Sequence, residues 1–144
     1  EGGGGGGEEW SAFNDAAEDQ VRLLREMVGS TPELSVEIEF EPSAIASRRP
    51  ILVQTLIFRN TSESDVAAFT CKAAVPKYMQ VQITPPSSST IQPNAPTDVT
   101  QTLRLSGVDP NKPIKVRLKL EYTCSSRGGA EETIDVNIGD LPAS

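Results

Sequence analysis

The feature that most constrains the fold is a strict alternation of apolar and charged residues over Ile114–Tyr122. The segment reads Ile-Lys-Val-Arg-Leu-Lys-Leu-Glu-Tyr, so that every second side chain is apolar and each one between is charged. A period of two predicts a β-strand with one buried face and one solvated face. The solvated face carries Lys115, Arg117 and Lys119 at alternate positions, about 7 Å apart. Such crowding of cations hints at an acidic partner, and the alternative is a strand face that only aids solubility.

Apolar and alternating segments of strand length recur along the chain from residue 34 onward. Turn residues and prolines separate them, and no helical pattern lies inside the series. This arrangement predicts an all-β fold, an antiparallel β-sandwich. The further strands are expected at Leu34–Phe40, Ile51–Phe58, Val66–Val75, Met79–Ile83, Val99–Leu105 and Thr133–Ile138, with a loop at Pro42–Arg49.

Residues 1–33 differ from the rest and are expected to form a flexible, acidic arm with a short helix. Eight acids and two arginines give this part a net charge of −6, out of −7 for the chain. Gly2–Gly7 is a flexible linker. Asn14 or Asp15 caps a helix expected over Ala16–Val28, which Gly29 and Pro32 end. The organisation predicted is therefore a linker over residues 1–33 and one sandwich domain over 34–144, a fragment of a longer polypeptide.

Composition excludes several classes of function. The chain has 144 residues, no histidine and two cysteines far apart in the sequence, which excludes a structural zinc site, a Ser-His-Asp triad and a Cys-His dyad. We expect no enzyme, no metal and no cofactor. The small cationic face, without interleaved aromatic residues, argues against nucleic-acid binding. No apolar run reaches the roughly 20 residues of a membrane span, so we expect a soluble, non-secreted protein with no direct membrane insertion.

The two cysteines, Cys71 and Cys124, fall in or beside expected strands. We expect free, buried thiols, because the Cys, Trp and Tyr-x-Cys pattern of secreted immunoglobulin domains is absent. A disulfide between them would instead indicate an extracellular immunoglobulin-like adhesion module, and this is the alternative function that we keep.

Two segments resemble a known family. The block Phe69-Thr-Cys-Lys-Ala-Ala-Val-Pro-Lys77, with the following strand and Pro85-Pro-Ser-Ser-Ser89, resembles the gamma-adaptin ear domain. The basic strand Lys115–Tyr122 is similar to that family's basic strand. The resemblance spans about residues 34–141.

The resemblance implies an immunoglobulin-like sandwich that recruits accessory proteins to clathrin coats at the trans-Golgi network and endosomes. Ears of this kind occur in the gamma subunit of the heterotetrameric clathrin adaptor and in the monomeric GGA adaptors. Their ligands are short peptides in which acidic residues flank Phe, Trp or Leu. By position in the motif, the peptide-binding residues are Ala74, Val75, Pro76, Lys77, Ile83, Lys115, Arg117 and Lys119. Lys115 departs from the Arg of gamma-type ears and lacks its two-pronged donor set.

The arm itself contains a segment with the composition of such a ligand. Glu8 and Glu9 precede Trp10, and Phe13 follows three residues later. The segment resembles the Trp-x-x-Phe motif in the hinge of some GGA adaptors, which favours that group over the gamma subunit. We expect it to dock on an ear groove, in its own chain or in a neighbouring one. The alternative is that Trp10 and Phe13 pack on the first strand or on the helix.

Overall fold

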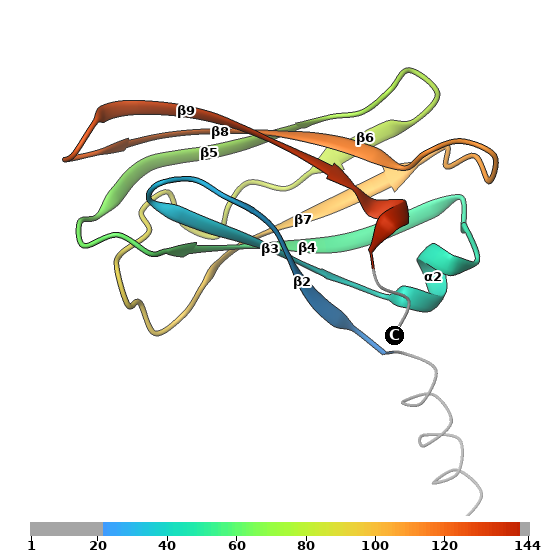
Figure 1. Ribbon diagram of the computed structural model, residues 1–144, viewed down its shortest axis with the longest axis horizontal. Helices are drawn as coiled ribbons and strands as arrows, with labels where there is room; N and C mark the ends of the chain where they lie inside the picture. The colour runs from blue at the N-terminus through green and yellow to red at the C-terminus, as the bar shows by residue number, and fades with distance from the viewer. Residues whose placement is uncertain (1–21, 142–144) are drawn as a thin grey trace, which may run out of the picture.

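The computed structural model describes residues 22–141, which form two antiparallel β-sheets packed face to face (Figure 1). The five-stranded sheet has the order β2-β3-β4-β7-β6, and the three-stranded sheet has the order β5-β8-β9. The expected all-β sandwich is confirmed, and each of the seven expected strands is present. The strands are β2 Leu24–Ser30, β3 Leu34–Phe40, β4 Ile51–Asn60, β5 Val66–Ala74, β6 Gln80–Ile83, β7 Val99–Ser106, β8 Lys115–Cys124 and β9 Gly128–Asn137.

The helix expected over Ala16–Val28 is wrong in the part that the structure describes. Leu24–Ser30 forms the strand β2, which pairs antiparallel with β3 from Leu24 opposite Phe40 to Ser30 opposite Ser35. Residues 16–21 lie outside the described residues. The free edge of β3 supplies backbone hydrogen bonds to β2, and such partners outweigh a local helical pattern. The five-stranded sheet therefore begins ahead of residue 34, where the sequence placed the domain boundary.

The described helices are short and lie at one end of the sandwich. The loop expected over Pro42–Arg49 contains the five-residue helix α2, Pro42–Ala46, and the 3-10 turn η1 covers Ile138–Asp140. Helix α2 packs against η1 (Figure 1). Within residues 22–141, no helix has the length and apolar character needed to cross a membrane.

The core lies between the sheets and is built from the alternate apolar side chains of facing strands. On β8, Val116, Leu118, Leu120 and Tyr122 are buried, while Lys115, Arg117 and Lys119 are exposed, as the alternation predicts. The rings of Phe58 and Phe69 meet across the core with centroids 4.7 Å apart in a tilted arrangement. The largest fully buried side chains are Phe40, Phe58, Phe69, Leu34, Ile38, Leu52, Leu56, Leu103, Leu105, Ile114, Leu118 and Leu120.

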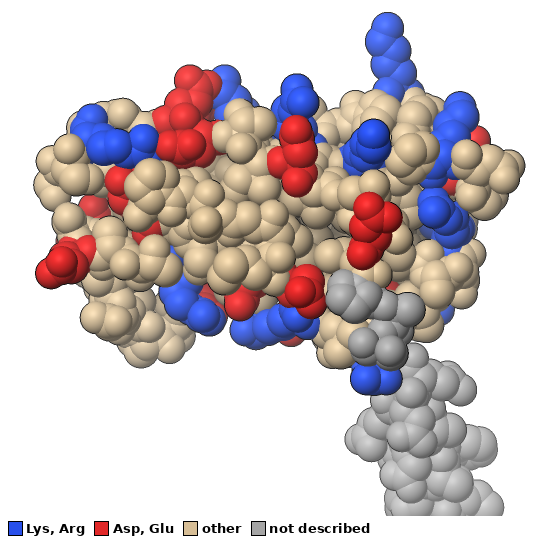
Figure 2. Space-filling view, in the orientation of Figure 1, with Lys and Arg blue, Asp and Glu red and all other residues tan. Residues whose placement is uncertain are grey.

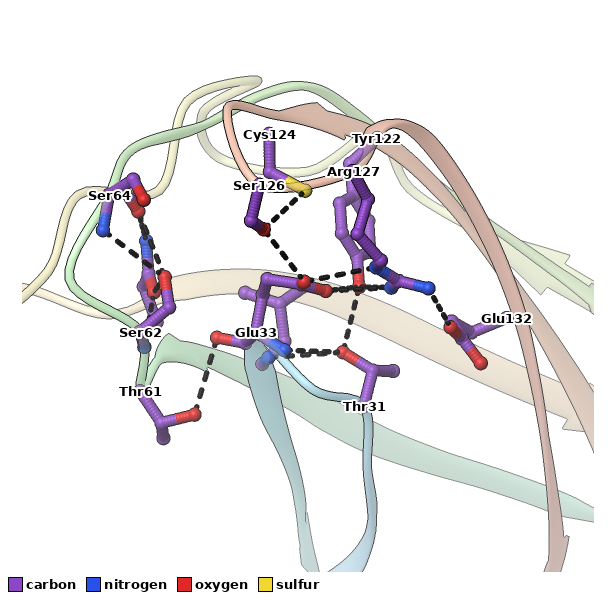
Figure 3. A network of polar contacts seen from close by, with 12 residues as sticks. Thr31, Glu33, Thr61, Ser62, Ser64, Tyr122, Cys124, Ser126, Arg127 and Glu132 are labelled. Carbon is purple, nitrogen blue, oxygen red and sulfur yellow. Dashed lines mark hydrogen bonds and ion pairs between the residues drawn. The ribbon is translucent and has the colours of Figure 1, made fainter.

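A buried polar network ties the two sheets together at the end of β8 that follows Tyr122 (Figure 3). Glu33, in the turn between β2 and β3, accepts hydrogen bonds from Arg127 Nη2 at 2.7 Å and Nε at 3.0 Å. The Tyr122 hydroxyl donates to the same carboxylate at 2.6 Å, and it lies 2.8 Å from Thr31 Oγ1. Arg127 also pairs with Glu132 at 2.9 Å. We call this set of residues the Glu33 clamp.

The clamp keeps Glu33 charged although its side chain is only 5% exposed. The hydrogen bonds from Arg127 lower the pKa of Glu33 to about 2 against the opposing effect of burial, and the Tyr122 hydroxyl lowers it further. A buried carboxylate needs such partners, because an unpaired charge in this position would be strongly destabilising.

Cys71 and Cys124 are both buried and both free, as the sequence predicts. Val66 pairs with Cys124 and Cys71 with Leu120 in the ladder between β5 and β8, so the two thiols occupy different levels of the same strand pair.

Candidate functional site

The turn between β5 and β6 forms a braced corner at one end of the sandwich. Strand β5 ends at Ala74, and Met79 N donates to Pro76 O at 3.0 Å to close the turn. The Tyr78 hydroxyl donates to Pro113 O at 2.5 Å. The Lys112 ammonium lies 4.8 Å from the centroid of the Tyr78 ring, within the range of a cation–π contact. These contacts attach the corner to the loop that leads into β8.

An open groove of about 490 Å³ lies between this corner and the first residues of β8. Pairing across three strands places Ala74 beside Arg117 and Arg117 beside Asp135, so that these side chains share the outer face of the three-stranded sheet. Lys115 pairs with Asn137 in the same ladder. The residues that line the groove are Ala74, Val75, Pro76, Lys115, Val116, Arg117, Asp135, Val136 and Asn137.

The groove has an apolar wall and a charged rim. Arg117 donates to both oxygens of Asp135, from Nε at 2.8 Å and from Nη2 at 3.4 Å. These bonds raise the pKa of Arg117 and lower that of Asp135, so both groups are charged at neutral pH. Lys115 has no ion pair within residues 22–141. In Figure 2, the right-hand end of the molecule, where α2 and the start of β8 lie, shows more basic than acidic side chains.

Five of the eight residues predicted for peptide binding line this groove together: Ala74, Val75, Pro76, Lys115 and Arg117. The other three lie elsewhere. Lys77 is exposed one residue beyond Pro76 in the turn, and Lys119 lies two residues farther along β8, where its ammonium pairs with Glu131 at 2.6 Å. Ile83 lies on β6 opposite Leu103 and packs against the core. The binding role of all eight residues stays a prediction.

A second hollow lies on the other side of the same corner. Ala74 and Val75 line both hollows, and the second one adds β6 from Gln80 to Gln82 together with Met79, Arg104 and Ser106. Arg104 donates to Gln82 Oε1 at 3.3 Å in the second hollow, and polar groups make up a larger share of its lining than of the first.

The sequence interpretation missed Asp135, Asn137 and Tyr78. The first two line the groove from β9, and Tyr78 braces the corner. The register between β8 and β9 was needed to find Asp135, and the turn Ser125–Arg127 sets that register through the pair Cys124 and Gly128. If the sequence analysis had assigned a tight hairpin turn to Ser125–Arg127, the register would have placed Asp135 opposite Arg117.

The arm segment Glu8, Glu9, Trp10 and Phe13 lies outside the described residues. Strand β2 starts at Leu24, opposite Phe40, which is followed by α2. Helix α2 contacts η1, and η1 follows directly after the groove residue Asn137. The chain therefore enters the sandwich at the end that carries the groove. The Glu33 clamp lies at the other end of β8, about 30 Å away for a strand of ten residues.

Chemically, the arrangement suits the binding of a partner. Among residues 22–141, no cluster of three or more His, Cys, Asp or Glu side chains is placed to hold a metal ion. The groove offers apolar surface beside donors that carry positive charge, which is the complement of an anionic peptide with large apolar side chains.

Comparisons with known proteins agree with this architecture. Residues 28–138 match the family model of the adaptin C-terminal domain. The chain is 41% identical to the AP-1 complex subunit gamma of Dictyostelium discoideum over 68 residues, which are 46% of this chain and 8% of that protein. It is 30% identical to the ADP-ribosylation factor-binding protein GGA2 of Saccharomyces cerevisiae over 123 residues, 84% of this chain and 20% of that protein.

Solved structures give the same result. The crystal structure of the GAE domain of GGA2p from Saccharomyces cerevisiae superposes with a TM-score of 0.66 at 27% identity, covering 83% of this chain and 97% of that one. The chain thus spans a small part of the curated relatives and almost the whole of this isolated domain. The family match over 28–138, the two relatives and the shared sandwich show that the chain belongs to the adaptin C-terminal domain family as a gamma-adaptin ear, a non-catalytic protein-interaction appendage of clathrin adaptors.

Proposed function

We propose that the groove binds short peptides of accessory proteins, in which acidic residues flank a Phe or Trp side chain. The observation that carries the proposal is the position of Lys115 and Arg117 beside the apolar corner of Ala74, Val75 and Pro76. An aromatic ring of the peptide lies against the corner, and its neighbouring carboxylates face the two cations. Charge complementarity of this kind sets the register of a peptide and speeds its encounter with the groove.

The expected affinity is micromolar. Full burial of an aromatic or large aliphatic side chain contributes roughly 1.5 to 3 kcal/mol, and an open groove captures only part of this. Ordering a disordered peptide costs about 2 to 5 kcal/mol. The exposed rim adds little net affinity but makes the association rate sensitive to salt. A single motif therefore binds weakly and exchanges rapidly.

The place of action that we propose is the surface of clathrin-coated membranes at the trans-Golgi network and endosomes. Support comes from the matched relatives, a gamma subunit of the AP-1 complex and a GGA protein. The domain acts there as a peripheral, cytoplasmic module, with accessory proteins as partners and with no nucleic acid and no membrane insertion. The family match and the two free thiols favour this role over an extracellular adhesion module.

Calorimetric titration of the full chain with an acidic peptide containing one Phe tests the proposal. We expect a dissociation constant in the micromolar range that weakens as salt rises. One control peptide replaces Phe by Ala and is expected to bind at least tenfold more weakly. The other replaces the acids by their amides and is expected to bind about two- to fivefold more weakly and to lose the salt dependence. Equal binding of all three peptides, or tight binding that ignores salt, would contradict the proposal. The charge reversal Arg117→Glu reports whether binding occurs at this groove, which Arg117 lines, and Lys77→Glu reports whether the peptide extends to the neighbouring turn.

We further propose that the arm segment with Trp10 and Phe13 occupies the groove of its own chain. Eight residues lie between Phe13 and Arg22, the first described residue, so nine steps of about 3.3 Å each span up to about 30 Å. The start of β2 and the groove lie at the same end of the sandwich, which supports docking in cis. A ligand on a short tether experiences an effective concentration near the millimolar range, so even a weak motif competes with external peptides.

The double variant Trp10→Ala, Phe13→Ala tests docking in cis. For a motif with an intrinsic dissociation constant near 100 µM, removing it should raise the affinity for an external peptide about tenfold. Glu1→Gln is a matched control in the same arm, since it leaves the motif intact. Unchanged affinity in the double variant would contradict docking in cis. Self-association that depends on Trp10 and on protein concentration would indicate docking on a neighbouring chain.

A further inference from the structure

The arginine on the rim of the groove already has a carboxylate partner. Arg117 and Asp135 face each other in the ladder between β8 and β9, and two hydrogen bonds of 2.8 and 3.4 Å join the guanidinium to both carboxylate oxygens. This is the two-pronged geometry that a carboxylate of a bound peptide would use. Asp135 therefore occupies the donors that the proposed ligand needs.

Because Asp135 lies in the groove, its ion pair with Arg117 affects the binding of a ligand there. Asp135 lines the groove together with Arg117 and Lys115, and the side chains of Asp135 and Arg117 are both 66% exposed. Both groups are well hydrated, so their attraction is weak and another carboxylate can replace Asp135 on Arg117. The positive charge of Lys115 helps to lower the pKa of Asp135. Lys115 itself forms no ion pair within the described residues. A peptide carboxylate that enters the groove thus meets one unpaired cation, one paired cation and one anion.

We propose that Asp135 is an internal competitor of the ligand: it holds Arg117 in the free domain and yields it to the carboxylate of a bound peptide. This inference rests on the proposed function and adds a residue that sets the affinity and charge selectivity of the groove. Each binding event exchanges one carboxylate for another on Arg117, so the gain from that contact is only the difference between them. Asp135 also repels acidic side chains that do not reach the rim, which disfavours loosely placed anionic peptides.

The second pair on the same ladder provides a matched control. Lys119 pairs with Glu131 at 2.6 Å on the outer face of the same two strands, but neither residue lines the groove. Glu131→Gln and Asp135→Asn each remove one negative charge and one cross-strand ion pair. Only Asp135→Asn frees a donor inside the groove, so a difference between the variants separates local competition from a change in overall charge.

The experiment measures the affinity of the full chain for an acidic peptide with one Phe, and for its amide counterpart. Asp135→Asn is expected to bind the acidic peptide about two- to fivefold more tightly than the wild type, the ratio typical of an exposed ion pair. The amide peptide is expected to show no such gain, and Glu131→Gln no gain with either peptide. The Nε–H signal of Arg117 in NMR spectra should shift on going to Asp135→Asn, and also when the acidic peptide is added to the wild type.

Three results would overturn the inference. Equal gains in Asp135→Asn and Glu131→Gln would assign the effect to net charge. Binding by the wild type without a gain in Asp135→Asn would show that Asp135 does not compete, while the proposed function stands. Failure of wild type and Asp135→Asn alike to bind the acidic peptide would overturn the proposed function, and with it this inference. Thermal melting of each variant checks that the exposed substitutions leave the fold intact.

Discussion

Gly29 of β2 and Ile134 of β9 lie in contact where the two sheets meet along one side of the sandwich. A Cβ atom on residue 29 would stand 2.7 Å from Cγ2 of Ile134, closer than such atoms pack in proteins. The bulge between Met27 and Gly29 brings the β2 backbone to this position. The absence of a side chain at residue 29 therefore allows the edge of one sheet to approach the other.

Gly29→Ala is expected to destabilise the domain. Replacing glycine by alanine usually stabilises slightly through the unfolded state, but forced overpacking costs about 1 to 3 kcal/mol and should prevail here. Urea denaturation measures the free energy of unfolding. Gly129→Ala in β9 is the matched control, because no atom lies within 4 Å of a Cβ built there. Equal stabilities of the two variants would contradict the close approach.

The Glu33 clamp predicts a loss of stability in acid. The pKa of Glu33 is about 2 in the folded domain against an ordinary value of 4.5, so the folded state binds fewer protons between these values. The contribution of Glu33 is fully present above about pH 5 and is lost as the pH falls toward 2. Denaturation curves from pH 6 to 2 should show this fall. Glu33→Gln should be less stable at pH 6, and its stability should change less with pH because the contribution of Glu33 is gone. Some pH dependence should remain, because the pKa values of Asp98 and Asp135 are also lowered in the folded domain.

The thiol of Cys71 is expected to be unreactive in the native domain. Burial raises its pKa from 9.0 to about 12, and the thiolate is the species that reacts. In a Cys124→Ser variant, modification by a thiol reagent at pH 8 should be slower than for an exposed cysteine by about 100-fold or more. The same variant in denaturant should react at the ordinary rate. Rapid modification of the native variant would show that Cys71 is accessible.

Neutralising Lys115 should weaken peptide binding more than neutralising Lys119. Lys115 lines the groove without an ion pair in the described part of the chain, whereas Lys119 lies outside the lining and is held by Glu131. We expect Lys115→Gln to lower the affinity for an acidic peptide about two- to fivefold and Lys119→Gln to have little effect. Both variants carry the same net charge, and calorimetry at two salt concentrations gives the comparison. The reverse order would place the rim farther along β8.

The strands could be predicted because burial of one sheet face requires apolar residues at alternate positions of the sequence. Alternation on β8 identified its inner side chains without knowledge of the partner strands, and the turn Gly107–Pro113 marked its start. The expected end at Tyr122 falls two residues short of Cys124, the last residue of β8. Strand β2 shows no such alternation. Leu24 and Val28 are four residues apart, which fits one face of a helix and one face of a strand equally well. Pairing with the edge of β3 makes this segment a strand, and the sequence of the segment alone does not show that this edge is available.

Only those parts of the candidate site that lie within one continuous segment of the sequence could be predicted. The corner Ala74–Pro76 is one segment, and Lys115 and Arg117 share one strand face, so each group was visible by itself. Their meeting depends on the register that pairs Ala74 with Arg117. The same alternation included Lys119, because it gives the face of a residue but not the length of the groove. Asp135 required a second register, between β8 and β9.

The groove is lined by residues of β5, β8 and β9, and ladders of hydrogen bonds already join these three neighbouring strands. The backbone of such a surface needs no rearrangement to accept a peptide, and only the side-chain pair of Arg117 and Asp135 and the arm have to give way. Under the proposed function, each bound peptide dissociates quickly, and many different peptides can bind one ear domain in succession. Lasting attachment to a coat then requires several such weak contacts at once, supplied by repeated motifs or by clustered adaptors.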